Sequence, residues 1–271
     1  MEPSLDFTQL KGNMRAMWSA GDFGQIARYT AREAEDFVER LDIRPGMKVL
    51  DIACGTGNLA IPAARKGAQV TGIDLAANLL EQARARASAE GLTATFETGD
   101  AEELPYPDRS FDVVMSMYGA MFAPRPERVV AEFCRVCRSG GTVAMANWTP
   151  GGFVGESFRL SAGYVPPPPG IPAPVLWGDE SVVRERFNGR VSALHTEKRN
   201  ATFDYPFDPA SVVRFFRDYF GPTKVGFARL EPDAQAAYAA DLEQQWRAHN
   251  RGGADRTLIQ AEYLAVRATV V

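Results

Sequence analysis

The sequence contains few of the residues that support disulfide, metal or nucleic-acid chemistry. Only three cysteines and two histidines occur among its 271 residues. Three cysteines are too few for a disulfide framework, and their use is typical of a reducing cytoplasm. The formal net charge is −4, so the chain lacks the basic surface that nucleic-acid binding usually requires. The composition therefore predicts a cytoplasmic protein with no nucleic-acid partner.

Long hydrophobic runs are also missing. No apolar stretch approaches the roughly 20 residues needed to cross a bilayer, which predicts that the chain has no membrane span. The first ten residues, "MEPSLDFTQL", carry acids and lack the basic-then-apolar pattern of an export signal. The sequence shows no internal repeat and no signal for an oligomeric state.

Short apolar runs alternate with helical patterns through the middle of the chain. Such alternation is typical of crossover units that build a parallel sheet covered by helices on both faces. We therefore expect an α/β, Rossmann-like fold with a seven-stranded, mostly parallel sheet and an inserted cap. The expected strands of this region are 47–53, 68–74, 94–100, 111–118 and 142–148, and the expected helices are 58–67, 77–91 and 125–141.

The alternation stops after Trp148. A proline-rich stretch, "VPPPPGIPAP", cannot form regular helix or sheet. Beyond it, a strand is expected over 191–205, and a helix begins at Asp208, where Asp followed by Pro suits an N-cap and a first helical position. A second helix over 233–249 and a strand over 261–271 complete the chain. The sequence thus divides into N-terminal helices (1–44), a parallel core (45–150), and a cap with the last two strands and helices (151–271).

A glycine-rich loop follows the first expected strand. The stretch "CGTGNLA" fits the pattern G-x-G-x-x-A, in which Gly55 and Gly57 allow a tight turn and close approach of backbone to a ligand. The helix after the loop would present the positive end of its dipole. Asp51 stands just before the glycines and would repel a pyrophosphate, whereas it would attract an ammonium group. The loop therefore favours a cationic ligand.

Two further acids end neighbouring strands. Asp74 closes the second expected strand, where a carboxylate can accept from both hydroxyls of a ribose. Asp100 closes the third, within reach of an adenine amino group. Because ligands of open α/β sheets bind outside the carboxyl ends of the strands, the three acids together indicate a positively charged nucleoside.

Four stretches together resemble a class I S-adenosylmethionine-dependent methyltransferase: "VLDIACGTGNLAIPAA", "GIDLAANLLEQARARA", "TGDAEELPYPDRSFDVVMSMYGAMF" and "EFCRVCRSGGTVAMANW". The resemblance is greatest to the ubiquinone and menaquinone biosynthesis methyltransferase-like group (methyltransferase type 11). It implies S-adenosylmethionine as the cofactor and N-terminal helices folded over it. The residues that would bind the cofactor are Asp51, Ala53, Gly55 and Gly57 at the methionine part, Asp74 at the ribose, Asp100 and Ala101 at the adenine, and Met117 and Tyr118 near the sulfonium. Thr56 and Leu75 complete the set of expected cofactor-binding residues.

The methyl acceptor is expected to be a small, largely apolar molecule, because the cap offers aromatics, prolines and methionines but no basic tract. No residue stands out as catalytic, since the cofactor supplies the activation and a base is needed only for an acceptor that keeps its proton. The candidate pocket residues are Trp18, Phe23, Tyr29, Phe122, Trp177 and His195, with Phe187 beside Trp177 as part of a roof.

Three alternatives remain open at this level. The glycine loop could serve a nicotinamide-dependent oxidoreductase, although the chain lacks a Tyr-x-x-x-Lys pattern, or a nucleoside-binding module that methylates nothing. Cys134 and Cys137, placed on one face of the helix over 125–141, could join Cys54 in a soft-metal or arsenic site. A buried structural pair is the favoured interpretation, so no metal is expected.

Overall fold

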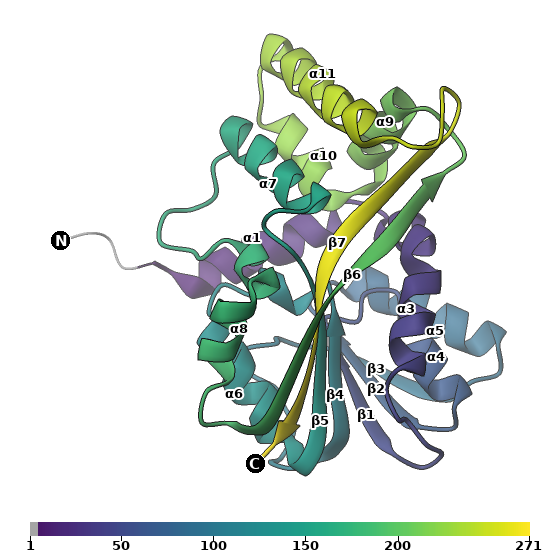
Figure 1. The fold of residues 1–271 in the computed structure, drawn as a ribbon, viewed down its shortest axis with the longest axis vertical. Helices are drawn as coiled ribbons and strands as arrows, with labels where there is room; N and C mark the ends of the chain where they lie inside the picture. The colour runs from purple at the N-terminus through teal and green to yellow at the C-terminus, as the bar shows by residue number, and fades with distance from the viewer. Residues whose placement is uncertain (1–4) are drawn as a thin grey trace.

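A computed structural model describes residues 5–271 and shows an open seven-stranded sheet with helices on both faces (Figure 1). The strand order is β3-β2-β1-β4-β5-β7-β6. All neighbouring pairs are parallel except those of β7, which runs antiparallel to β5 and β6. This architecture confirms the expected α/β, Rossmann-like fold. The strands are β1 (Lys48–Ile52), β2 (Gln69–Asp74), β3 (Ala94–Thr98), β4 (Phe111–Met117), β5 (Cys137–Trp148), β6 (Val191–Tyr205) and β7 (Thr257–Val270).

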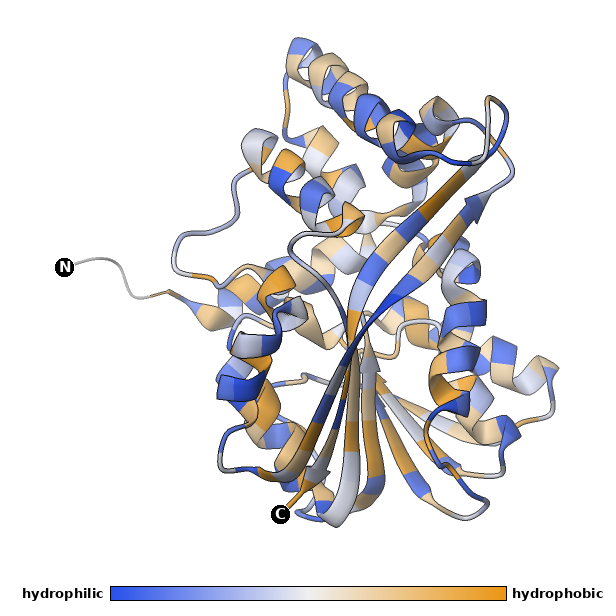
Figure 2. Cartoon of the chain, in the orientation of Figure 1, coloured by the Kyte–Doolittle hydropathy of each residue, from blue (hydrophilic) through white to orange (hydrophobic). Residues whose placement is uncertain are grey.

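Helices cover the two faces of the sheet and its carboxyl end. In Figure 1, α3, α4 and α5 lie on one side, α6 and α8 lie on the other, and α1 lies beyond the ends of the parallel strands. The central strands are hydrophobic along most of their length (Figure 2) because helices exclude water from both of their faces. The helices are α1 (Phe7–Ser19), α2 (Phe23–Ala27), α3 (Ala31–Glu39), α4 (Ala60–Arg65), α5 (Ala77–Ala89), α6 (Pro126–Val136), α7 (Phe153–Tyr164), α8 (Glu180–Phe187), α9 (Pro209–Tyr219), α10 (Gly221–Ala228) and α11 (Pro232–His249), with short 3-10 helices η1 (Arg28–Thr30), η2 (Ala120–Phe122) and η3 (Pro174–Gly178).

The last two strands extend beyond the sheet as a two-stranded ribbon. β6 pairs with β7 along its whole length, whereas β5 pairs only with the part of β7 from Tyr263 to Thr269. The ribbon carries α9, α10 and α11, which the chain inserts between the two strands (Figure 1). Asp208 caps α9 as expected, because its Oδ1 accepts from the backbone N–H of Ser211 at 2.6 Å.

Three helices were not expected from the sequence. α7 contains interior glycines, α8 follows the proline-rich stretch, and α10 opens with Gly221 and Pro222. The glycines and the proline weaken the local helix signal of α7 and α10. α8 has an N-cap that the sequence analysis missed, since Oδ1 of Asp179 accepts from the N–H groups of Ser181 and Val182. Buried side chains on all three, among them Phe153, Val183 and Phe227, show that tertiary packing stabilises them.

The predicted end of the helix before β5 was wrong. α6 ends at Val136, and Cys137 is the first residue of β5, where it pairs with Phe111 of β4. Cys134 and Cys137 therefore do not share a helix face. Burial raises the pKa of the Cys134 thiol to about 11 and that of Cys137 to about 12. Within residues 5–271, no three His, Cys, Asp or Glu side chains are grouped so that they could hold a metal ion.

Among the described residues, no helix combines the length and the apolar character that crossing a membrane requires.

Candidate functional site

The glycine loop turns sharply between β1 and α4. Ala53, Gly55 and Gly57 have φ angles of 54°, 52° and 82°, in the left-handed region that favours glycine. Asp51, which is 1% exposed, accepts from the backbone N–H of Ala60 through its Oδ2 at 3.0 Å. The acid at the end of β1 thus fixes the loop against the start of the following helix.

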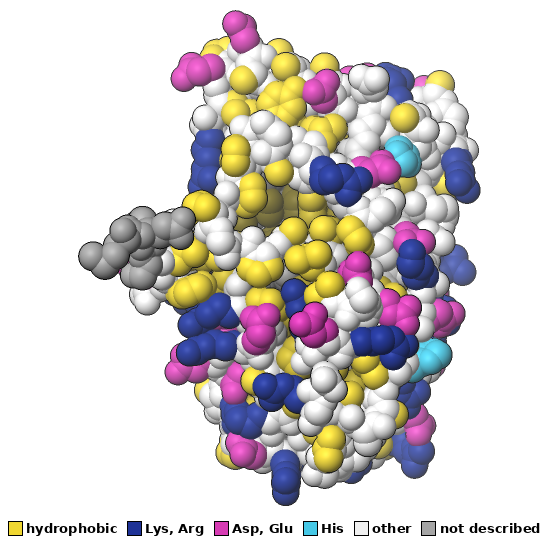
Figure 3. Space-filling view, turned by 60° about the vertical axis from the view of Figure 1, so that its left-hand side comes forward, with side chains coloured by type: hydrophobic (Ala, Val, Ile, Leu, Met, Phe, Trp, Pro, Cys, Tyr) yellow, Lys and Arg dark blue, Asp and Glu magenta, His cyan; other side chains and the backbone are white. Residues whose placement is uncertain are grey.

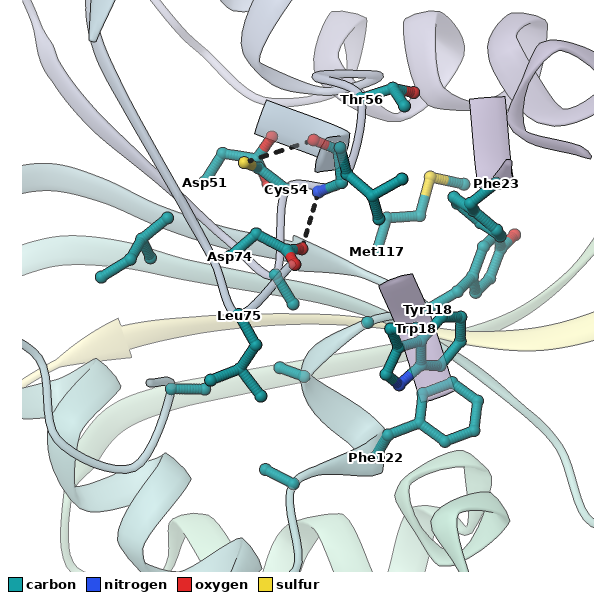
Figure 4. A pocket seen from close by; sticks show the side chains of 18 of the residues that line it. Trp18, Phe23, Asp51, Cys54, Thr56, Asp74, Leu75, Met117, Tyr118 and Phe122 are labelled. Carbon is teal, nitrogen blue, oxygen red and sulfur yellow. Dashed lines mark hydrogen bonds between the residues drawn. The ribbon is translucent and has the colours of Figure 1, made fainter. Parts of the chain in front are cut away.

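Asp74 binds the same loop from β2. Its Oδ2 accepts from the N–H of Gly55 at 2.9 Å, drawn as a dashed line in Figure 4, and its Oδ1 accepts from the N–H of Ala76 at 2.8 Å. Burial raises the pKa of Asp74, and it raises the pKa of Asp51 well above its ordinary value. A cationic ligand would compensate these two buried carboxylates.

Arg86 of α5 supports the loop from behind. Its Nη1 donates to the carbonyl oxygen of Thr56 at 2.6 Å and to Oδ1 of Asn58 at 2.8 Å, and Asn58 in turn donates to the carbonyl oxygen of Ala27. The sequence analysis missed this contact. An arginine on a surface-like helix pattern carries no local signal that it will turn toward a loop.

Asp100 is paired with a lysine from the first helix. Lys11 Nζ lies 2.5 Å from Oδ2 of Asp100 and 2.6 Å from Oε2 of Glu102. The Glu102 carboxylate is buried and also accepts from the backbone N–H and the guanidinium of Arg125. The sequence analysis identified Asp100 at the end of β3, but it did not identify Lys11 or Arg125 as cations near it.

These elements surround a pocket of about 1080 Å³, part of which is open to solvent, at the carboxyl ends of the strands. Figure 3 shows a hollow lined by hydrophobic side chains on the face of the molecule that it presents. In Figure 4 the acids Asp51 and Asp74 lie on one side of the pocket, and the rings of Trp18, Tyr118 and Phe122 gather on the other. The pocket therefore has a polar end and an aromatic end.

The pocket brings together most of the residues that the sequence analysis selected. Of the cofactor candidates, all but Gly57 line it: Asp51, Ala53, Gly55, Thr56, Asp74, Leu75, Asp100, Ala101, Met117 and Tyr118. Of the acceptor candidates, Trp18, Phe23 and Phe122 line it. Cys54 also lines it, packed with its Sγ over Gly72.

Three acceptor candidates lie elsewhere. The ring of Tyr29 packs 4.3 Å from that of Tyr205 on the ribbon. Trp177 is 1% exposed and lies beneath the guanidinium of Arg186, and the neighbouring Phe187 is equally buried in the core. His195 is exposed on β6, opposite Arg267 of β7. None of these side chains lines the pocket, because each belongs to an element whose direction is set by packing outside it.

The end of β4 lies against the glycine loop. Tyr118 has a φ of 59°, and its ring stacks on that of Trp148 at 3.7 Å between centroids. The next residue, Gly119, has no room for a side chain, because a Cβ there would lie 2.6 Å from Cβ of Ala53 and 2.7 Å from its carbonyl oxygen. This close approach sets the width of the pocket between β1 and β4.

We expect Gly119→Ala to push these two strand ends apart. The overlap predicts a loss of about 1–3 kcal/mol in the free energy of unfolding and weaker cofactor binding, measurable by denaturant unfolding and calorimetric titration. Gly163→Ala is the matched control, since Gly163 lies in α7 with no atom near its missing Cβ. Equal stability and affinity of the two variants would contradict this assignment of Gly119.

The described pocket residues fit a cationic nucleoside. Three carboxylates face the pocket and Lys11 is the one lining residue with a positive side chain, so an extended anionic group would be repelled. A Cβ at Gly55 would only touch the ring of Phe23, whose nearest atom would lie 3.7 Å away, so the missing side chain leaves room there for a small ligand group. That space lets a ligand contact the backbone of the loop.

Comparison with known proteins identifies the family. Residues 49–141 match the family model of a methyltransferase domain. The uncharacterized protein Rv1403c of Mycobacterium tuberculosis is 38% identical over 254 residues, which cover 92% of this chain and 91% of that protein. A phosphatidylethanolamine N-methyltransferase of Cereibacter sphaeroides is 37% identical over 134 residues, 48% of this chain and 64% of that enzyme.

Solved structures share the fold. YcgJ of Bacillus subtilis gives a TM-score of 0.60 at 18% identity, covering 88% of this chain and 97% of that one. An N-methyltransferase of Haemonchus contortus, in complex with phosphomonomethylethanolamine and S-adenosylhomocysteine, gives 0.56 at 20% identity, covering 88% and 52%.

These matches select methyl transfer over the nicotinamide-dependent and non-catalytic alternatives, and they identify S-adenosylmethionine as the cofactor. The chain belongs to the family of class I S-adenosylmethionine-dependent methyltransferases.

Proposed function

We propose that this methyltransferase acts on a small, largely apolar molecule, which binds at the aromatic end of the pocket. The observation that carries the proposal is the cluster of Trp18, Phe23 and Phe122 in the pocket wall, with ring centroids of Trp18 5.9 Å from Phe23 and 5.1 Å from Phe122. Met14 and Met117 extend this wall. Such a surface favours an apolar group beside the accepting atom.

We also propose how the cofactor lies in the pocket. Asp51 and the backbone of Gly55 and Gly57 would hold its methionine part, and Asp74 would accept from its ribose hydroxyls. The adenine would lie beside Asp100, Ala101 and Leu75, and the sulfonium near Met117 and Tyr118. The support for this placement is that the acids end three adjacent strands at one edge of the sheet.

The N-terminal helices and the segments after β5 would enclose the acceptor. Phe220, just after α9, lies 5.6 Å from Trp18, and Phe158 of α7 lies 5.8 Å from Phe122. Both distances join ring centroids. We propose the division into N-terminal helices (1–44), core (45–150) and cap (151–271) on the basis of these contacts, since both outer parts contribute rings to the aromatic cluster.

When bound, S-adenosylmethionine supplies a methyl group on a positively charged sulfur, which becomes neutral as an acceptor lone pair displaces it. The chain would contribute alignment and exclusion of water. Asp51 and Asp74 fix one end of the pocket by their backbone hydrogen bonds, and the aromatic wall covers the other.

We propose that no side chain acts as a general base. Within residues 5–271, no histidine lines the pocket, and burial raises the pKa of the Tyr118 hydroxyl well above its ordinary value. The preferred acceptor would therefore present a lone pair that is available at neutral pH, on a carboxylate, an unprotonated amine or an activated carbon. The relative from Cereibacter sphaeroides, named for N-methylation of phosphatidylethanolamine, supports only an amine nitrogen as one possible accepting atom.

A transfer assay tests the proposal. Radiolabelled methyl would be followed from the cofactor into panels of apolar amines, carboxylic acids and phenols, with single-stranded RNA and a basic peptide as contrasting acceptors. We expect transfer only to members of the amine and carboxylic acid panels, because a phenol keeps its proton at neutral pH and would need a general base. Trp18→Ala should raise KM for the best acceptor with little change in cofactor affinity, whereas labelling of the RNA or the peptide alone would overturn the assignment of acceptor class.

A further inference from the structure

The pairing of Lys11 with Asp100 joins the first helix to the end of β3. The two residues are 89 positions apart in the sequence, and the ammonium lies 2.5 Å from Oδ2 of the carboxylate. The Lys11 side chain is 15% exposed, and it lines the pocket together with Asp100. An ion pair this sheltered is screened less by solvent than a surface pair.

Lys11 is not needed to satisfy the neighbouring acid. Oε1 of Glu102 accepts from the backbone N–H of Arg125 at 2.6 Å, and Oε2 accepts from Nε of Arg125 at 2.7 Å. The Asp100 carboxylate has only one other donor among the described residues, the backbone N–H of Glu102, which reaches its Oδ1 at 2.9 Å. Lys11 is thus the cation that fixes the Asp100 carboxylate.

We propose that Lys11 is a positioning residue for recognition of the adenine base. Its ammonium donates to Oδ2 of Asp100, and the backbone N–H of Glu102 donates to Oδ1, so both oxygens of the carboxylate are fixed. Each carboxylate oxygen keeps a second lone pair, which can accept from the amino group of adenine. This inference rests on the proposed placement of adenine beside Asp100.

The same contact places α1 over the adenine end of the pocket. Figure 1 shows α1 lying beyond the carboxyl ends of the parallel strands. Base recognition and the position of this helix are therefore coupled through one side chain, and loss of Lys11 should affect the choice of base as well as the affinity.

Helix α1 has other attachments that should keep it folded without Lys11. Asp6 caps its start, accepting from the N–H groups of Thr8 and Gln9. At its other end, a Cβ on Gly221 would lie 2.2 Å from the carbonyl oxygen of Met17, so the helix packs directly on the start of α10. Lys11→Met, which keeps the aliphatic stem, is thus a suitable variant.

The test compares two ligands that differ only at the base. Calorimetric titration would measure dissociation constants for S-adenosylhomocysteine and for S-inosylhomocysteine, in which a carbonyl oxygen replaces the amino group. We expect the full-length protein to prefer the adenine ligand by at least about tenfold, since the carbonyl oxygen would face a carboxylate. In Lys11→Met the preference should fall to less than about threefold, and Lys11→Arg should restore most of it.

Lys66→Met is the control, because Lys66 pairs with Glu39 away from the pocket, and thermal unfolding would confirm that each variant is folded. Equal weakening of both ligands in Lys11→Met would indicate a merely structural role and overturn the inference, as would an unchanged preference. Failure of the proposed adenine site would look different: the unmodified protein would bind both ligands equally, or neither.

Discussion

Asp74→Ala is expected to weaken binding of S-adenosylmethionine by about 100-fold or more. Two hydrogen bonds from the ribose hydroxyls to a charged acceptor contribute about 1.5 kcal/mol or more each, and about 1.4 kcal/mol corresponds to tenfold in affinity. The variant also removes the acceptor for the N–H groups of Gly55 and Ala76, so the glycine loop would lose its link to β2. Calorimetric titration with S-adenosylmethionine and S-adenosylhomocysteine measures the loss.

The control for this variant is Asp42→Ala. Asp42 is an exposed acid paired with Arg44, outside the pocket, and its removal should leave both affinities unchanged. Asp74→Asn should fall between the two, since its amide oxygen can replace one acceptor but carries no charge. An Asp74→Ala protein that binds the cofactor within about threefold of the unmodified protein would contradict the assignment of the ribose site.

Asp51→Asn is expected to make the cofactor-free protein more stable and the cofactor bind less well. The Asp51 carboxyl is buried, and burial raises its pKa well above the ordinary value. Replacing a buried charge with a neutral group of the same shape should add about 1 kcal/mol to the free energy of unfolding at neutral pH, or about 2–4 °C in Tm for a chain of this size. Loss of the charge facing the methionine ammonium should weaken binding roughly 10- to 100-fold.

The pH dependence follows from the direction of the shift. The pKa of Asp51 is higher in the folded chain than in the unfolded chain. The contribution of Asp51 to stability is therefore fully present at a pH below its pKa in the unfolded chain, and it is lost as the pH rises through its pKa in the folded chain. The Tm difference between Asp51→Asn and the unmodified protein should therefore grow with pH. Cofactor affinity should rise with pH over the same range in the unmodified protein and less in the variant. Differential scanning calorimetry at several pH values checks the first statement; a Tm gap that is constant or shrinks with pH would exclude a buried ionisable Asp51 as its cause.

The local features of the sequence predicted the core of the fold. Strands and helices from Lys48 to Trp148 follow from short apolar runs, helical spacing and glycine stops, all of which act over a few residues. The glycine loop and the acids at strand ends are also local. Since the carboxyl ends of parallel strands meet at one edge of a sheet, their order along the chain was enough to predict one site.

The helices beyond β5 were harder to predict, because their stability comes from packing. α7 and α10 contain glycine or proline, so propensity alone opposes them. α8 is short and comes soon after the proline-rich stretch, although Asp179 caps its start. The end of α6 was wrong for a related reason: Cys137 suits a helix locally, but pairing with Phe111 on β4 draws it into the sheet.

The fold class, the glycine loop and the three acids that end adjacent strands could all be predicted from the amino-acid sequence. Which side chains from distant segments reach the pocket could be known only from the folded chain. Folding brings Lys11 to Asp100 and Trp18 to Phe122, and it directs three other candidates away from the pocket: Tyr29, Trp177 and His195. This difference arises because turn-forming residues and the spacing of hydrophobic residues determine structure only between near neighbours in the chain. The direction of a helix or an edge strand is set instead by the surfaces it packs against.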